Sequence, residues 1–221
     1  MDDMILLENV TLTLQSPAGP VNILRGASLR AAAGEHLAVV GPSGAGKTTL
    51  LMLMAGLERA SSGLVRVAGS DLTGMDEDAL ARFRRQSVGI VFQAFHLAPA
   101  MTALENVALP LEFARRPRAL ESAATALDKV GLANRASHYP AQLSGGEQQR
   151  VALARAIVAS PRIILADEPT GNLDAATGAR VIDMLFNLAH DSGATMVLIT
   201  HDMTLAARCG RLARMADGVV L

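Results

Sequence analysis

The chain has 221 residues, half of them hydrophobic, and a formal net charge of −1. This length suits one large domain or one domain with an inserted lobe, and the charge argues against a general nucleic-acid-binding surface, which needs a basic face. The one cysteine excludes a disulfide within the chain and fits a reducing cytosol. No apolar run approaches the roughly 20 residues that span a bilayer, so any action at a membrane requires a partner.

The first part of the chain predicts mainly strands. In NVTLTLQ, Val10, Leu12 and Leu14 alternate with polar residues, as in a half-buried strand. The turn cluster SPAGP at 16–20 leads into VNILRGASL, which we expect to be the returning strand. The run HLAVV at 36–40 enters a glycine-rich loop, and TTLLMLMAGL after that loop predicts a helix. LVRVAG and VGIVFQ predict two further strands.

The second part of the chain predicts helices and buried strands. Residues 94–157 contain few strand signals and are expected to be helical. The runs RIILAD at 162–167 and TMVLIT at 195–200 are continuously apolar, which suits parallel strands buried on both faces. Between them, ARVIDMLFNLAH places Val181 and Leu185 on one face of a predicted helix.

The alternation of strands and helices predicts an α/β fold. Near the end of the sequence, Asp217-Gly218 stands between apolar pairs, a pattern typical of a β-hairpin. We expect one domain, in which residues 1–93 and 158–221 form the core with its strands and residues 94–157 form a helical subdomain.

The stretch GPSGAGKTT matches the phosphate-binding pattern G-x-x-x-x-G-K-[ST]. The glycines let backbone N–H groups turn toward phosphate oxygens, Lys47 reaches the β and γ oxygens, and Thr48 can bind Mg²⁺. The strand before and the helix after the loop favour this interpretation over a purely structural glycine turn. The predicted binding residues are Gly41, Pro42, Ser43, Gly44, Ala45, Gly46, Lys47, Thr48 and Thr49.

Polar side chains directly after neighbouring strands would complete such a site. Asp167 would hold Mg²⁺, and Glu168 would orient or deprotonate the attacking water. A solvated strand end is the alternative, which the phosphate loop and the following PT disfavour. Gln93 and His201 end two other strands. Because parallel strands deliver their carboxyl ends to one crevice, both are predicted near the same phosphate.

A second glycine-rich turn, LSGGEQQ, lies about a hundred residues further along the chain. Ser144 stands where a helix should begin, and Glu147 follows three residues later, which predicts a capping box. Gly145 and Gly146 would leave the first turn bare. The sequence therefore predicts a positive, unobstructed anion site at this helix end.

The segments GPSGAGKTT, VFQ, LSGGEQQR, IILADEPTGNLD and ITHD occur in the order and approximate spacing of ABC-type ATPase subunits, and the resemblance covers nearly the whole chain. It implies a RecA-like P-loop ATPase core with an N-terminal antiparallel β subdomain and an inserted α-helical subdomain. It also implies ATP as substrate and Mg²⁺ held by Thr48, Gln93 and Asp167. The catalytic residues that it implies are Glu168, His201, Gln93 and Lys47.

The resemblance further implies an ATP-dependent homodimer in which two ATP molecules lie between head-to-tail subunits. The segment GNLD at 171–174 would run along the dimer seam, with Asp174 linking the two sites. The second glycine-rich turn, the signature of this family, would cover the ATP bound by the other subunit. The residues implied for it are Leu143, Ser144, Gly145, Gly146, Glu147 and Gln148.

Most members of this family drive integral membrane permeases, so the resemblance implies a cytoplasmic protein attached peripherally to the inner membrane through such a partner. The segment 93–107, with Phe95, Leu97 and Met101, would line the groove that receives a permease helix; ordinary packing of the helical subdomain is the alternative. PTGNLD and SGLVRVAGSDLTGMDEDALARFR resemble the lipoprotein-release and macrolide-efflux group, and PAQLSGGEQQRVALARA resembles its YbbA-like members. Permeases of this group often transmit force to periplasmic partners.

Two other functions compete with this interpretation. A soluble ABC ATPase acting on DNA or ribosomes is the first, but such proteins insert long coiled coils or carry two ATPase domains. A nucleotide-binding module without hydrolysis is the second, and Glu168 and His201 argue against it. One departure from the family is Leu14, which stands where an aromatic residue usually stacks on adenine. We therefore expect weak discrimination of ATP from GTP. From the net charge of the chain, we expect no nucleic-acid partner.

Overall fold

The computed structural model describes residues 3–17 and 19–221, so the predicted turn at 16–20 lies partly outside the described residues, at Ala18. The chain forms two compact units. One consists of Met1–Arg84 with Thr195–Leu221, and the other of Arg85–Ala194. Helix α2 (Glu77–Ser87) crosses the first boundary between them.

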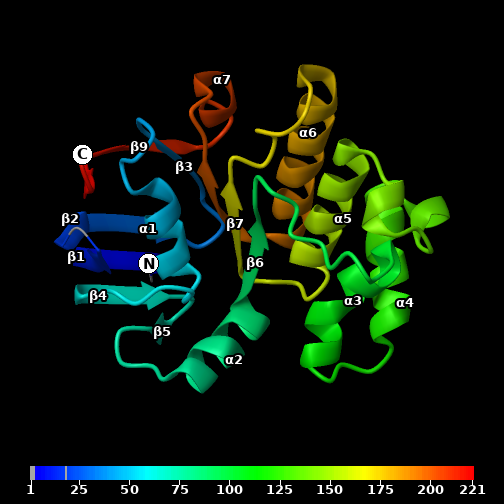
Figure 1. Ribbon diagram of the computed structural model, residues 1–221, viewed down its shortest axis with the longest axis horizontal. Helices are drawn as coiled ribbons and strands as arrows, with labels where there is room; N and C mark the ends of the chain where they lie inside the picture. Colours follow the sequence, from blue (N-terminus) through cyan, green and yellow to red (C-terminus); the bar gives the residue numbers. More distant parts are fainter. Residues whose placement is uncertain (1–2, 18) are drawn as a thin grey trace. The chain divides into compact units, whose positions relative to one another are not determined.

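The first unit contains an antiparallel sheet in the order β2-β1-β4-β5. Its strands are β1 (Asp3–Ser16), β2 (Gly19–Ala32), β4 (Ser62–Val67) and β5 (Ser70–Asp71). Helix α1 (Lys47–Met54) contacts two strands of this sheet, β2 and β4 (Figure 1). The predicted hairpin of the first two strands is confirmed.

A bulge in β1 changes which side chains face the core. Leu7 is buried before the bulge, and Val10 and Leu12 are buried after it, so the inward positions shift from odd to even numbers. Asn9, at the bulge, has a φ of 48°, a left-handed conformation that asparagine tolerates. Leu14 was predicted to share the face of Val10 and Leu12, but it is 41% exposed near the end of the hairpin.

The same unit holds four strands in the order β10-β9-β3-β8. They are β3 (His36–Val40), β8 (Thr195–Ile199), β9 (Arg211–Ala216) and β10 (Val219–Val220). β3 pairs in parallel with β8 and β9, and every residue of β8 is buried. A continuous apolar run thus forms a strand covered on both faces, as predicted.

The predicted hairpin at the end of the chain is also confirmed. β9 and β10 are antiparallel, and the two residues between them, Asp217 and Gly218, have φ angles of 48° and 78°. Two positive φ angles are what the tightest two-residue hairpin turns require. Gly218 also lies so close to the Ile23 carbonyl that a Cβ would overlap it.

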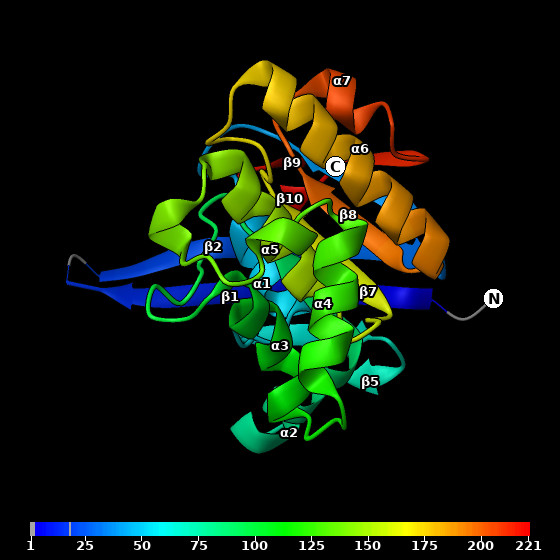
Figure 2. The ribbon, with the colours of Figure 1, turned by 90° about the vertical axis from the view of Figure 1, so that its right-hand side faces the viewer.

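The second unit combines a parallel strand pair with helices. β6 (Val88–Val91) pairs with β7 (Ile163–Asp167). The helices are α3 (Ala103–Phe113), α4 (Ala119–Lys129), α5 (Gly145–Ile157) and α6 (Ala175–Ser192), with 3₁₀ turns η1 (Ala133–Arg135) and η2 (Pro140–Gln142). Figure 2 shows α3, α4 and α5 beside one another, around a core that includes Val107, Leu127 and Val151.

Helix α6 shows how local signals set an element's ends. Asp174 caps its beginning by accepting the Thr177 N–H at 3.0 Å, and Gly193 ends it with a φ of 64°. Val181 and Leu185, predicted to share one face, are both buried. The remaining helix, α7 (Met203–Ala206), belongs to the first unit. Within the part of the chain that the structure describes, none of the helices has the length and hydrophobicity needed to cross a membrane.

The α/β class predicted from the alternation of strands and helices is confirmed. All regular elements between residues 94 and 157, a range described throughout, are helical, as the sequence indicates. The subdomain boundaries at 93/94 and 157/158 stay a prediction.

Candidate nucleotide-binding and hydrolysis site

The glycine-rich loop connects β3 to α1 and has the geometry of an anion cradle. Gly44 and Gly46 have φ angles of 80° and 95°, which residues with a Cβ rarely adopt. Gly41 lies against the Met215 carbonyl, where a Cβ would overlap it. Helix α1 begins at Lys47, and its N-cap residue, Gly46, has no side chain that could cap it. The first N–H groups of the helix and the helix dipole favour a phosphate at this end.

Lys47 lies within this loop rather than extending into solvent. The residue is 7% exposed, and its Nζ donates to the carbonyl oxygens of Gly41 and Pro42 at 2.8 Å each. The loop backbone therefore fixes the ammonium against the same turn whose N–H groups form the cradle.

His201 enters the first unit's site from the strand next to the loop. In the parallel pair of β3 and β8, Val39 lies opposite Ile199. The loop follows β3 and His201 follows β8 two residues later, so both leave the sheet at the same edge. The His201 side chain is exposed at this edge.

In the second unit, the parallel strands bring Gln93 and the two acidic residues together. Val91 of β6 lies opposite Ala166 of β7, so Gln93, Asp167 and Glu168 all follow at one edge. Glu168 has a φ of 42°, an unfavourable value for a residue with a side chain, and its carbonyl accepts the Gly171 N–H at 3.0 Å. Such strain concentrates at functional positions.

Gln93 is held by the turn that follows the acidic pair. Its Nε2 donates to Asn172 Oδ1 at 3.3 Å, and Asn172 Nδ2 donates back to the Gln93 carbonyl at 3.0 Å. A Cβ on Gly171 would lie 2.7 Å from Gln93 Nε2, so a side chain at position 171 would displace Gln93 from this position. The sequence assigned Gly171 and Asn172 to the dimer seam and did not show that they position Gln93.

The predicted capping box at the start of α5 is confirmed. Ser144 Oγ accepts the Glu147 N–H at 3.3 Å, and Glu147 Oε2 accepts both the Ser144 N–H and its hydroxyl at 2.8 Å. The Ser144 backbone N–H, followed by its hydroxyl and by Arg135, holds the pKa of Glu147 below its usual range. The carboxylate is thus ionised at neutral pH, and Arg135 Nε lies 3.0 Å from its Oε1.

The sequence predicted a bare first turn of α5. The structure differs, because the glycines of this turn pack against the same unit. A Cβ on Gly146 would overlap the Thr177 methyl group, so α6 closes that side. A Cβ on Gly145 would lie 3.5 Å from Leu173 and 3.7 Å from Phe95, which is ordinary contact. Ser144 itself is exposed. The open part of the signature turn is therefore its tip at Ser144 and Gly145.

The other two signature residues support this turn from below. Leu143 is buried in the helical core, and Gln148 Nε2 donates to the Leu143 carbonyl at 3.1 Å. Their side chains anchor the turn. Asp174 is exposed, and the Thr177 backbone N–H lowers its pKa.

The side chains predicted to line a permease groove are less exposed than the sequence indicates. Phe95, Leu97 and Met101 are all half-buried, and Leu97 packs against the helical core. Part of this segment therefore follows the alternative interpretation, in which it packs within its own subdomain.

Two residues of α5 that the sequence did not single out hold the segment around Gln93. Gln149 is fully buried and donates to the Phe92 carbonyl, while Arg155 donates to the carbonyls of Phe95 and His96 at 2.9 and 2.6 Å. Gln149 interrupts the apolar stripe of this helix, and that is the one sequence signal that could have revealed it.

The side chains predicted to hold Mg²⁺ have donor atoms of a suitable kind. Thr48 of the first unit offers a hydroxyl oxygen, and Gln93 and Asp167 of the second unit offer amide and carboxylate oxygens, the hard donors that Mg²⁺ prefers together with substrate phosphates. Among the described residues, no group of three or more histidine, cysteine, aspartate or glutamate side chains could bind a metal by itself.

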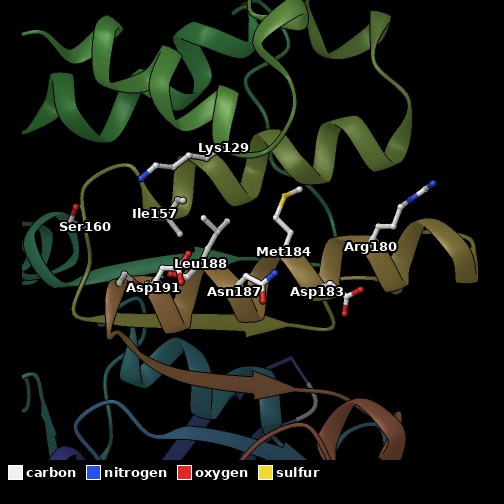
Figure 3. Close-up of a pocket in the computed structure, with 10 residues that line it drawn as sticks. Lys129, Ile157, Ser160, Arg180, Asp183, Met184, Asn187, Leu188 and Asp191 are labelled. Atoms are coloured by element: carbon white, nitrogen blue, oxygen red, sulfur yellow. Dashed lines mark hydrogen bonds between the residues drawn. The ribbon is translucent and has the colours of Figure 1, made fainter.

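A separate groove lies along α6 in the second unit. It has a volume of about 660 Å³, and Figure 3 shows Asp183, Met184, Asn187 and Leu188 of α6 on one side and Ile157 on the other. None of the predicted site residues lines this groove, so we do not assign nucleotide binding to it.

Several ABC transporter ATP-binding proteins are similar to this chain in sequence. The ABC transporter family matches residues 24–171. The chain is 50% identical over 200 residues to the uncharacterized ABC transporter ATP-binding protein YbbA of Escherichia coli K12, covering 90% of this chain and 88% of that protein. It is 49% identical over 220 residues to the lipoprotein-releasing system ATP-binding protein LolD of Geobacter metallireducens, covering 98% of each.

Longer relatives and solved structures also match. The macrolide export ATP-binding/permease protein MacB of Shigella flexneri is 44% identical over 220 residues, which are 98% of this chain and 34% of that protein. The dimeric ATP-binding cassette MJ0796, solved in a post-hydrolysis state with ADP and phosphate, superimposes with a TM-score of 0.91 at 39% identity, covering 98% of this chain and 96% of that one.

Proposed function

The chain belongs to the ABC transporter family of ATP-binding proteins, and we propose that it is the ATP-hydrolysing subunit of a transporter of the LolD and MacB type. The observation that carries this proposal is the capped signature turn, whose exposed tip at Ser144 is held by α5 beside the Gln93 segment. Phosphate-binding loops occur in many ATPases, but this turn serves a nucleotide held by another subunit.

The glycine-rich loop and the start of α1 bind ATP. The N–H groups of the loop and the uncapped start of α1 receive the phosphates, and Lys47, held by the Gly41 and Pro42 carbonyls, neutralises the β and γ oxygens. Thr48, Gln93 and Asp167 would hold Mg²⁺, which supplies charge neutralisation at the phosphates when bound.

The residues that follow β6, β7 and β8 carry out hydrolysis. Glu168 accepts the proton of the attacking water, and its left-handed backbone conformation, with a φ of 42°, lies directly after β7. His201 donates a hydrogen bond to the γ-phosphate region, and Gln93 orients the water and reports on the phosphate. The Asn172 contact gives Gln93 a defined starting position.

The signature turn and Asp174 act between two copies of the chain. We propose that Ser144 and Gly145 of one subunit close over the ATP of the other, and that Asp174 lies at the seam. The exposed positions of Ser144 and Asp174 support this assignment, and the dimeric cassette MJ0796 offers a structural precedent at 39% identity. ATP then draws the subunits together, and hydrolysis lets them separate.

The mechanical work passes to an integral membrane permease. The names of LolD and MacB associate those proteins with lipoprotein release and macrolide export, and we infer a permease of the same mechanotransmission or export type for this chain. The protein would then lie in the cytoplasm, attached to the inner membrane through that permease.

Isolation of the tagged full-length chain from detergent-solubilised membranes tests this function. We expect an integral membrane protein to co-purify and to change the rate of ATP hydrolysis. Recovery of the chain with ribosomes or nucleic acid, and without a membrane protein, would favour the alternative of a soluble ABC ATPase. A chain that binds ATP without hydrolysing it, alone or with the membrane protein, would contradict the ATPase assignment.

A change at Leu14 should reveal how the adenine base is recognised. Leu14 is exposed beside Val21 on the first hairpin and presents no aromatic face. Because base–aromatic stacking contributes ~1–3 kcal/mol, Leu14→Tyr should bind ATP at least about fivefold more tightly by equilibrium titration. Leu120→Tyr, which adds the same ring to the exposed surface of α4, serves as the control. A strong preference of the wild-type chain for ATP over GTP would contradict the expectation.

A further inference from the structure

A buried glutamine joins the signature helix to both turns that carry the hydrolytic residues. Gln149 is 0% exposed, and its Nε2 donates to the Phe92 carbonyl at 3.1 Å and to the Pro169 carbonyl at 2.6 Å. Phe92 directly precedes Gln93, and Pro169 directly follows Glu168. One amide group therefore holds both backbone segments at the same point of α5.

Arg155, on the same helix, binds the segment that follows Gln93. Arg155 donates to the carbonyls of Phe95 and His96, beyond Gln93, and burial lowers its pKa. Gln149, by contrast, links the segment before Gln93 and the segment after Glu168 to each other as well as to the helix.

The orientation of the Gln149 amide follows from its partners. Both partners are carbonyl oxygens, which only accept hydrogen bonds, so the NH₂ group must face them and uses both of its hydrogens. The Oε1 atom is left buried with no hydrogen-bond partner among the described residues. A buried acceptor without a partner costs stability, so the position is poorly explained by stability alone.

We propose that Gln149 is a positioning residue that couples the signature helix to Gln93 and Glu168. On the proposed function, the tip of α5 contacts the nucleotide of the partner subunit. Any displacement of α5 during closure then moves the Phe92 and Pro169 carbonyls together and brings Gln93 and Glu168 into place in one step. Gln149 does not touch the nucleotide and acts only through these two residues.

Replacement by methionine tests this coupling, because Gln149→Met keeps the side-chain length and removes both hydrogen bonds. We expect kcat for ATP to fall at least about tenfold, while the Kd for ATP measured in the presence of Mg²⁺ changes by less than about twofold. Hydrogen exchange should accelerate in residues 92–96 and 168–173 and stay unchanged in residues 41–49. The exchange experiment needs neither nucleotide nor activity.

Thr195→Val is the matched control for lost stability. Thr195 is also fully buried, donates to the Ala32 carbonyl and accepts the Gly34 N–H, at the end of β8 opposite to His201. We expect it to lower the thermal midpoint without changing kcat. An equal loss of kcat in both variants, or faster exchange at only one of the two segments in Gln149→Met, would overturn the proposal.

A second variant keeps the test decisive if the methionine variant does not fold. Gln149→Asn retains the amide but is one methylene shorter, so it cannot reach both carbonyls. It should show the same fall in kcat and the same paired change in exchange. If the wild-type chain itself lacks ATPase activity, the proposed function fails. If the wild type is active and the asparagine variant keeps its kcat, only the coupling fails.

Discussion

Replacing Glu168 with glutamine should slow ATP hydrolysis by at least about 100-fold and trap an ATP-bound dimer. Glutamine has the same shape as glutamate but cannot accept the proton of the attacking water. The turn that presents the side chain depends on backbone contacts, because the Gly171 N–H donates to the Glu168 carbonyl. The substitution therefore removes the base and leaves the phosphate loop and the fold in place.

Two measurements separate this result from general damage. Equilibrium binding should give an ATP affinity within about twofold of wild type, and sedimentation should show a dimer with ATP and a monomer without it. Glu112→Gln, which removes the same charge from an exposed position on α3, should hydrolyse ATP at the wild-type rate. A Glu168→Gln chain that turns over normally, or that stays monomeric with ATP, would refute the catalytic assignment.

The elements that the sequence predicts best are those whose signals are local. The buried run at 36–40 forms β3 with the predicted bounds, Asp217-Gly218 forms a hairpin, and Ser144 with Glu147 forms a capping box. In each case the residues that carry the signal also make the defining contact. Such features require no knowledge of what packs against them.

The features that the sequence did not reveal depend on residues far apart in the chain. Gln149 binds carbonyls that lie 57 and 20 residues away, and Gly146 is needed because Thr177 of another helix packs on it. A register shift between Leu12 and Thr13 interrupts β1, and none of the residues after Leu12 in this strand is buried, so the alternation that includes Leu14 ends there. Periodicity cannot anticipate an extra residue in a strand.

The phosphate-binding residues could be named from the sequence, but their contacts could not. Lys47 is predicted to reach the β and γ oxygens, and the structure adds that its ammonium group binds two carbonyls of its own loop. Gln93 was expected to hold metal, and it also forms a reciprocal pair with Asn172. Backbone carbonyls thus position Lys47, and the Asn172 amide positions Gln93, without a bound ligand.

Mixing two inactive variants should restore part of the ATPase activity. If Lys47 of one subunit and Ser144 of the other serve the same ATP, a heterodimer of Lys47→Ala and Ser144→Ala has both defects in one site and an intact second site. An equal mixture should then recover about a quarter of wild-type activity, because half of the dimers are mixed and each has one intact site. If each chain supplied its own complete site, every site in the mixture would carry one defect, and no activity would return.

A reciprocal mixture tests the same site arrangement, with both substitutions in one chain. A chain carrying both substitutions, mixed with wild type, places one defect in each site of the heterodimer, so only the remaining wild-type homodimers should be active. Because Ser144 also caps α5, Ser144→Ala should destabilise that helix by ~1 kcal/mol. Asp76→Ala, which removes the side chain that accepts the Ala79 N–H at the start of α2, controls for a lost cap alone. Wild-type homodimers are a quarter of the dimers in an equal mixture, so about a quarter of wild-type activity should remain. About half of wild-type activity would contradict the shared site, because each mixed dimer would then keep one intact site.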